Sequence, residues 1–304
     1  MKAFVVALCI AIVFAVFGLP FLLPEPLPPA PPSARDWGAF TGPSPEDTAE
    51  FERLVGRRMT NRATFVHWGN EREFPTELAR SLDGQTLTIF WEAKDYNDPS
   101  TNQPNYSFEA ILRGDWDDYL LTFAQQVRDY GGPVILIPFE EMNGDWNPWS
   151  GTLNGNTPER FIEAYRYIRS FFEDVPNVRF GWAVNNQSRP DTPENAIDVY
   201  YPGDEAVDIV GVDGFNFGDP WQSFDEVFSD ALEQLATYRK PVYIFSMASA
   251  EGPRKADWIR DALGRGLQQH PEVAGWIWFN ENKERDWRIW SDPQSLAAFR
   301  ESLD

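Results

Sequence analysis

Residues 134–185 read VILIPFEEMNGDWNPWSGTLNGNTPERFIEAYRYIRSFFEDVPNVRFGWAVN, and this stretch indicates the fold class. It begins and ends with short apolar runs, 134–141 and 178–185, as expected for parallel strands that are buried on both faces. Between them Thr157 followed by Pro158 marks the start of a helix, along which apolar residues recur at helical spacing. The stretch therefore predicts one strand–helix–strand unit with parallel strands.

The same alternation continues along the chain. Ser223 and Glu226, for example, form a capping box at the start of another amphipathic segment. Because the strand–helix order is repeated eight times, it favours a closed barrel over an open sheet. We predict an α/β protein, a single (β/α)8 TIM barrel preceded by an N-terminal signal or anchor segment. The predicted strands are 37–42, 63–69, 86–92, 134–141, 178–185, 208–215, 241–247 and 273–280.

Composition narrows the classes of function. The 304 residues carry a net charge of −21, which disfavours a nucleic-acid partner because phosphates would be repelled. Neutral or basic ligands fit this charge better, although an acidic surface can also serve solubility alone. No glycine-rich phosphate-binding turn follows a predicted strand. The one cysteine, Cys9, lies in the N-terminal segment, and His67 and His270 are too few for a multi-histidine centre. We therefore expect no metal and no cofactor.

The N-terminal residues predict export of the protein. Residues 1–23 combine Lys2 with a long apolar run and predict a signal peptide or a membrane anchor. The lack of a clear cleavage site favours the anchor. Residues 24–36 form a proline-rich linker, and residues 37–304 form the barrel domain. We expect an extracellular or cell-surface monomer that contacts membrane only through its N-terminal segment.

In a (β/α)8 barrel the active site lies at the carboxyl ends of the strands. In this chain those ends are rich in tryptophan, asparagine and carboxylates, which can stack on sugar rings, bind hydroxyls and protonate a leaving oxygen. Each tryptophan alone is more often a core residue, but their occurrence together favours a glycan site. The predicted site residues are His67, Trp68, Trp91, Glu92, Glu140, Glu141, Trp182, Asn185, Asp213, Asn216, Ser246, Trp278 and Asn280.

The segment 138–149, PFEEMNGDWNPW, resembles glycoside hydrolase family 26, the β-mannanase family, in whose bacterial branch the motif reads HEMNGDWYPW. The similarity continues through TPERFIEAYRYIRSFF, YYPGDEAVDIVGVDGFNFG and WFNENKERDWRIWSDPQSLAAFR, and it extends from about residue 37 to residue 300. The resemblance implies a glycosidase in which Glu141 is the general acid/base. It further implies that Asn185 and Asn216 contact sugar, that Trp278 is a platform under the sugar being cleaved, and that Trp146 and Trp149 stack at outer subsites.

The chain departs from this family at three site positions. The family's strand-seven motif reads KPVMIAEFGSAEG, whereas residues 240–252 read KPVYIFSMASAEG. By that resemblance Ser246 occupies the position of the nucleophilic glutamate. Glu140 stands where the family has histidine, and Phe215 stands where it usually has tyrosine. A serine without an adjacent base is a poor nucleophile at neutral pH, so ordinary retaining chemistry is not expected.

Three alternatives remain. A water beside Ser246, activated by Asp213 or Glu251, would support inverting hydrolysis, although Glu251 is more simply explained as a loop-structuring residue. The protein would otherwise bind a β-glycan at the cell surface as a catalytically impaired pseudoenzyme. Glu140 as a replacement catalyst is least favoured, because neighbouring strand residues point to opposite faces. We predict an endo-β-mannanase-like glycosidase acting on β-mannan or a related β-linked polysaccharide, with the pseudoenzyme as the alternative.

Overall fold

The computed structural model describes residues 35–70 and 73–303, which form a closed barrel of eight parallel strands. Each strand pairs with the next along the chain, and β1 pairs with β8 to close the barrel. The predicted (β/α)8 barrel is therefore confirmed. The strands are β1 (Asp36–Phe40), β2 (Asn61–His67), β3 (Thr86–Glu92), β4 (Val134–Pro138), β5 (Val178–Asn185), β6 (Ile209–Asn216), β7 (Val242–Ser249) and β8 (Val273–Phe279).

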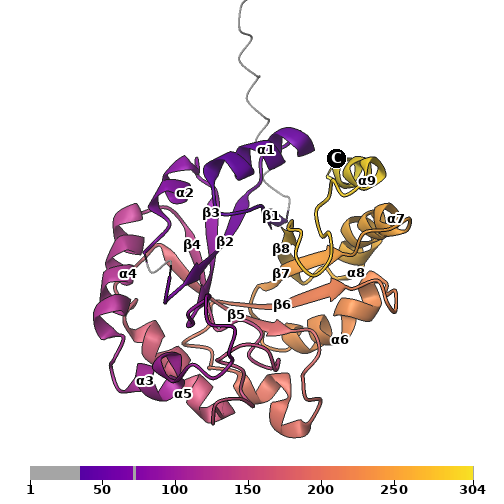
Figure 1. Cartoon of the computed structure of the whole chain (residues 1–304). Coiled ribbons are helices and arrows are strands. Elements are labelled where there is room, and N and C mark those ends of the chain that lie inside the picture. Colours follow the sequence, from indigo (N-terminus) through magenta and orange to yellow (C-terminus); the bar gives the residue numbers. More distant parts are fainter. Residues whose placement is uncertain (1–34, 71–72, 304) are drawn as a thin grey trace, which may run out of the picture.

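Helices surround the barrel, and Figure 1 shows the first and last of them, α1 and α9, side by side where the ring closes. The helices are α1 (Pro45–Val55), α2 (Thr76–Ser81), α3 (Phe108–Leu112), α4 (Asp117–Tyr130), α5 (Pro158–Ser170), α6 (Phe224–Ala236), α7 (Lys255–Asp261), α8 (Leu267–Gln269) and α9 (Pro293–Ser302). Short 3₁₀ turns η1 (Pro104–Tyr106), η2 (Pro193–Asn195) and η3 (Ile197–Tyr200) lie in the connections, and a π-helical turn, η4 (Ala262–Gly266), joins α7 to α8.

Local sequence explains where the main helices begin. The Thr157 side chain accepts a hydrogen bond from the backbone amide of Arg160 and Pro158 follows it, so α5 begins as predicted. Ser223 and Glu226 form the predicted capping box of α6. Both caps satisfy amide groups that a helix start leaves without partners.

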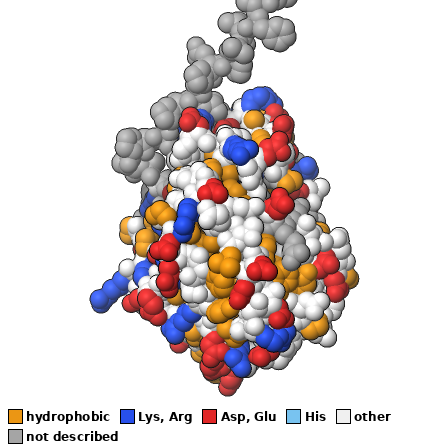
Figure 2. Space-filling view, turned by 90° about the vertical axis from the view of Figure 1, so that its left-hand side faces the viewer, with side chains coloured by type: hydrophobic (Ala, Val, Ile, Leu, Met, Phe, Trp, Pro, Cys, Tyr) orange, Lys and Arg blue, Asp and Glu red, His pale blue; other side chains and the backbone are white. Residues whose placement is uncertain are grey.

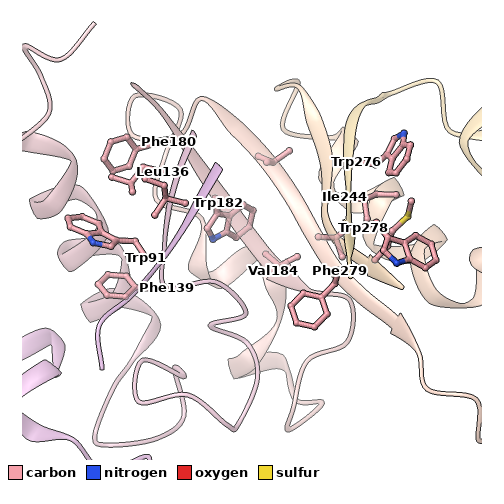
Figure 3. Packing of buried hydrophobic residues seen from close by; sticks show 14 of the residues in the cluster. Trp91, Leu136, Phe139, Phe180, Trp182, Val184, Ile244, Trp276, Trp278 and Phe279 are labelled. Atoms are coloured by element: carbon pink, nitrogen blue, oxygen red, sulfur yellow. The ribbon is translucent and has the colours of Figure 1, made fainter. Parts of the chain in front are cut away.

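The apolar side chains pack in two layers. Nine buried residues fill the inside of the barrel, among them Phe90, Ile137, Phe245 and Ile277. The larger layer lies between the strands and the helices, and Figure 3 shows Trp91 among its members. Because strand side chains alternate between the two faces, neighbouring residues of one strand belong to different layers.

Figure 2 shows acidic and basic side chains dispersed over one face of the molecule among apolar ones. The predicted signal or anchor, residues 1–23, and most of the predicted linker, residues 24–36, lie outside the described residues. Within residues 35–70 and 73–303, no helix has both the length and the apolar character needed to cross a membrane.

Candidate active site

A cavity of about 500 Å³ opens at the carboxyl ends of the barrel strands. Its wall is formed by residues that end the strands or begin the loops after them. Those among the predicted site residues are Glu92, Glu140, Glu141, Trp146, Asn185, Asp213, Phe215 and Ser246.

The chain leaves β4 by an unusual backbone path. The strand ends at Pro138, and Phe139 and Glu141 adopt φ angles of 59° and 56°, which are uncommon for residues other than glycine. Both Glu140 and Glu141 line the cavity as a result. The prediction of a strand through residue 141, with these two side chains on opposite faces, was wrong, because the alternation holds only for extended backbone. Strained backbone of this kind is often found at functional sites.

Glu141 has the properties of a proton donor that works near neutral pH. Burial raises the pKa of its carboxyl to about 7. The indole of Trp146 donates a hydrogen bond to Oε2 of Glu141 at 2.8 Å and acts in the opposite direction. A general acid is most effective when its pKa lies near the working pH.

Glu92, at the end of β3, is buried beside two basic side chains. Its carboxylate lies 2.5 Å from Nε2 of His67 and 2.6 Å from Nζ of Lys94. Burial alone would raise its pKa, but the hydrogen bond from His67 and the charge of Lys94 prevail and lower the pKa to about 2. Burial, and then the charge of Glu92, raise the pKa of Glu140 well above its ordinary value. The pKa values of these two neighbouring carboxyls are therefore shifted in opposite directions.

A bulge in β7 directs Ser246 into the cavity. Val212 of β6 pairs with Ile244, but the next pair is Asp213 with Ser246, so Phe245 is an extra residue. Phe245 and Ser246 consequently both face the inside of the barrel. Burial and the charge of Glu141 raise the pKa of Asp213 well above its ordinary value, and the hydroxyl and amide of Ser246 oppose this.

Exposed aromatic side chains lie around the mouth of the cavity. Trp146 is 39% exposed and Phe217 is 45% exposed, and both line the opening. Phe217 packs edge-on against Trp287, with ring centroids 5.2 Å apart. Tyr96, 62% exposed, lies over the His67 ring at 4.7 Å. Exposed aromatic faces next to a polar cavity suit a ligand that has both apolar faces and hydroxyl edges.

Comparison with known proteins identifies the family. The sequence model of glycosyl hydrolase family 26 matches residues 98–287. Endoglucanase H of Acetivibrio thermocellus is 36% identical over 281 residues, which cover 88% of this chain and 30% of that protein. The chain belongs to glycosyl hydrolase family 26. The resemblance stated from the sequence is thereby confirmed at the level of the family.

Other similar proteins are more distant. A mannan endo-1,4-beta-mannosidase of Bacillus subtilis is 29% identical over 187 residues, which cover 59% of this chain and 46% of the relative. The structure of a family 26 β-mannanase from Bacteroides ovatus superimposes with a TM-score of 0.63 at 15% identity, over 83% of this chain and 80% of the other. That likeness supports the fold alone. The chain spans less than half the length of the two curated relatives.

Four tryptophans that were predicted to contact substrate lie outside the cavity wall of this family 26 protein. Trp68, Trp91, Trp182 and Trp278 are fully buried in the outer packing layer and do not line the cavity. Figure 3 shows Trp91, Trp182 and Trp278 within that packing. Strand alternation explains this placement. On β8, for example, Phe279 points into the cavity, and its neighbour Trp278 therefore points to the outer face.

Three further predicted residues organise loops. Trp149 is buried and donates a hydrogen bond to the carbonyl of Glu140 at 2.7 Å, so it helps to fix the backbone that carries Glu140 and Glu141. The Asn216 side chain accepts hydrogen bonds from two amides of the loop after β6. Asn280 likewise accepts from the amide of Ile289 at 2.8 Å. None of the three lines the cavity, in contrast to the prediction.

His67 and Glu251 also take indirect positions. His67 contacts the cavity residue Glu92 and is not itself part of the wall. Glu251 is exposed and accepts a hydrogen bond from the amide of Asp286, which agrees with a loop-structuring residue. Of the two bases considered for an inverting reaction, only Asp213 lies at the cavity.

Several wall residues were missed from the sequence. Strand alternation counted inward from Glu92 would have found Phe90, and alternation along β8 would have found Phe279. Phe65 lies on β2, two residues before His67, and the same alternation would have found it. The remaining residues lie on loops, where no periodicity exists. The missed residues are Phe65, Phe90, Lys94, Asp145, Asn147, Asn186, Gln187, Arg189, Phe217, Gln222, Phe279, Lys283, Glu284 and Trp287.

The loop between β8 and α9 is held by a buried cation. Lys255 of α7 is fully buried, and its ammonium donates to the carbonyls of Asp286 and Arg288, both at 2.7 Å. This loop carries Lys283 and Trp287 to the cavity wall. Burial lowers the pKa of Lys255 to about 8, although neighbouring carboxylates oppose this. Lys255 is therefore a positioning residue for one side of the site.

Proposed function

We propose that this family 26 protein hydrolyses a β-linked polysaccharide, with Glu141 as the proton donor to the leaving oxygen. The observation that carries the proposal is the Glu141 carboxyl in a strand-end cavity, with its pKa raised by burial to about 7. A carboxyl with such a pKa keeps a large protonated fraction at neutral pH and can still release its proton.

The second part of the proposal concerns Ser246, which we place at the position of the family nucleophile. A serine side chain is shorter than glutamate and leaves room for a water molecule. Asp213 pairs with Ser246 across β6 and β7 and lines the same cavity. A deprotonated Asp213 would take a proton from that water as the water attacks the anomeric carbon, while Glu141 protonates the departing oxygen. Inverting hydrolysis proceeds in this way, with a water between two carboxyls about 6.5–9.5 Å apart.

A second candidate function is glycan binding without cleavage. The observation that favours it is the raised pKa of Asp213, because a raised pKa favours the protonated carboxyl and a protonated carboxyl cannot act as a base. The aromatic mouth and the polar wall would serve binding equally well. This candidate is the pseudoenzyme alternative.

The substrate class follows from the relatives only as a proposal. Their names include an endoglucanase, mannan endo-1,4-beta-mannosidases and beta-1,3-xylanases. We propose a β-linked backbone of mannan, glucan or xylan. From residues 1–23 we also propose that the protein is exported and acts at or outside the cell surface.

The test compares wild type, Ser246→Glu and Glu141→Gln on β-mannan, β-glucan and β-xylan, measuring both cleavage and binding. If wild type cuts, Glu141→Gln does not, and the first product formed has inverted anomeric configuration by NMR, the proposal holds. Retained configuration would exclude the inverting route through Asp213. Cleavage by Ser246→Glu alone would establish the binding function. If neither wild type nor Ser246→Glu cuts or binds any of these polysaccharides, the substrate class is wrong.

A further inference from the structure

The cavity carries an excess of carboxyl groups over basic groups. Six acidic and three basic side chains line it. The acidic ones are Glu92, Glu140, Glu141, Asp145, Asp213 and Glu284, and the basic ones are Lys94, Arg189 and Lys283. An uncharged sugar would leave this imbalance uncorrected.

The excess of acidic over basic side chains is greatest in the deepest part of the cavity. Glu140 and Asp213 are only 5% and 2% exposed. Of the three basic side chains, Lys283 is 60% exposed at the mouth, and Arg189 is exposed as well. Lys94 does lie deep, but its ammonium is already paired with Glu92 at 2.6 Å. The described part of the chain therefore supplies no further basic side chain to the carboxyls of Glu140 and Asp213.

Two carboxyl oxygens in this region have no donor. Within the described residues, no hydrogen-bond donor reaches Oε2 of Glu140 or Oδ1 of Asp213, although both atoms are buried. Buried acceptors without donors are rare in folded proteins and are costly to maintain. Glu140 can form a hydrogen bond with Glu92 only when one of the two carboxyls is protonated. These oxygens are therefore available to a donor that a ligand brings.

We propose that the cavity accepts a β-glycan with free amino groups, that is, a polymer of 2-amino-2-deoxy sugars, whose ammonium group binds at the buried carboxyls of the inner cavity, Glu140 above all. This inference rests on the proposed function and specifies the substrate of that site. An ammonium group supplies three donors and a positive charge, whereas a hydroxyl supplies one donor and no charge. An N-acetylated sugar would lose the charge and add bulk at the same position.

The position of the amine on the sugar agrees with the placement of the carboxyls. Glu141 must lie near the oxygen on C1 if it protonates the leaving group, and C2 is the next ring carbon. Glu140 and Asp213 are both close enough to Glu141 for its charge to raise their pKa values. A cation bound there would relieve the repulsion that the charge of Glu141 exerts on the neighbouring carboxyls. It would also favour the ionised form of Glu140, whose pKa is raised in the absence of a ligand.

The test measures binding by calorimetry at mildly acid pH, with β-1,4-linked oligosaccharides of equal length made of glucosamine, N-acetylglucosamine or glucose. We expect the glucosamine oligomer to bind at least about tenfold more tightly than either neutral oligomer, as one charge-assisted hydrogen bond gained at a buried site would give. We further expect proton release, seen as a binding heat that depends on the ionisation enthalpy of the buffer. Equal or tighter binding of the glucose oligomer would overturn the inference and leave the proposed function standing. If no oligomer binds, the inference fails, and the proposed function is then decided by the separate panel of β-mannan, β-glucan and β-xylan.

Variants separate a specific site from general attraction to an acidic protein. Glu140→Gln removes the charge at the proposed site, and Asp145→Asn removes the same charge from an exposed position at the cavity mouth. We expect Glu140→Gln to lose most of the preference for the amine, and Asp145→Asn to lose much less because water screens exposed charges. Equal losses in both would overturn the inference. Asp213→Asn serves as a second inner variant if Glu140→Gln does not fold.

Discussion

Replacing Glu141 by glutamine is expected to stabilise the protein above neutral pH, whatever the reaction it catalyses. Folding raises the pKa of this carboxyl from 4.5 to about 7 because of burial. Between these two pH values the folded protein holds a proton that the unfolded chain has already released. The free energy of unfolding therefore falls as the pH rises through this range, and above pH 7 the whole cost of the buried charge is present. Glutamine carries no such charge and still offers an oxygen to the Trp146 indole.

The magnitude follows from the same pKa values. A change from 4.5 to about 7 corresponds to about 3 kcal/mol at pH 8. The Glu141 side chain is only partly buried, so water in the cavity screens part of this cost. We therefore expect Glu141→Gln to raise the free energy of unfolding by about 1–3 kcal/mol at pH 8, and by nearly nothing at pH 4.5 or below.

Chemical denaturation at pH 8 and pH 4.5 measures both values. Glu233→Gln is the matched control, because it removes a carboxylate from an exposed position of α6 outside the cavity wall. It should change the free energy of unfolding by less than about 0.5 kcal/mol at either pH. A Glu141→Gln protein that is no more stable than wild type at pH 8 would contradict the reasoning. So would a gain of the same size at both pH values, because the effect would then not come from ionisation.

Three further changes test separate parts of the site. Trp146→Phe removes the donor to the ionised Glu141, and the NMR titration of that carboxyl should move up by about one pH unit, whereas an unchanged midpoint would rule out the hydrogen bond. Lys255→Met leaves two loop carbonyls without their donor and should lower the free energy of unfolding by about 1–2 kcal/mol, since relief of the buried charge offsets part of the loss; no loss would show that the loop is held by other contacts. Phe217→Ala should weaken polysaccharide binding about three- to tenfold. The control is Leu121→Ala, at an exposed apolar residue of α4 outside the cavity wall, which should leave binding unchanged. Equal effects of the two variants would show that Phe217 is not part of the binding surface.

The barrel could be predicted from the sequence because its signals are local and repeated. All eight predicted strands are present, with ends that differ by a few residues, and the caps of α5 and α6 lie where the sequence indicated. Apolar runs and capping residues each follow from short-range chemistry. Eight repeats of one unit leave few arrangements other than a closed ring.

The site could be predicted only where it follows the strands. Glu92, Asn185 and Asp213 lie at strand ends and line the cavity as expected. The tryptophans were misplaced because residue type was given more weight than strand alternation, which buries Trp91 and Trp278. Two other features depend on tertiary structure. Nothing in residues 139–141 indicates positive φ angles, and nothing in β7 indicates the bulge at Phe245.

These two irregularities explain how polar residues of β7 and of the segment after β4 come to line the cavity. A regular β4 would send Glu140 and Glu141 to opposite faces, and a regular β7 would place Ser246 on the same face as Ile244, in the outer packing layer. Both departures instead add polar side chains to the cavity, beside Asp213. Glu140, Glu141 and Asp213 all have pKa values raised by burial, so each carries a cost to folding whenever it is ionised. A barrel with a purely structural role would be more stable with uncharged residues at these positions, and the cost therefore argues that a ligand uses the cavity.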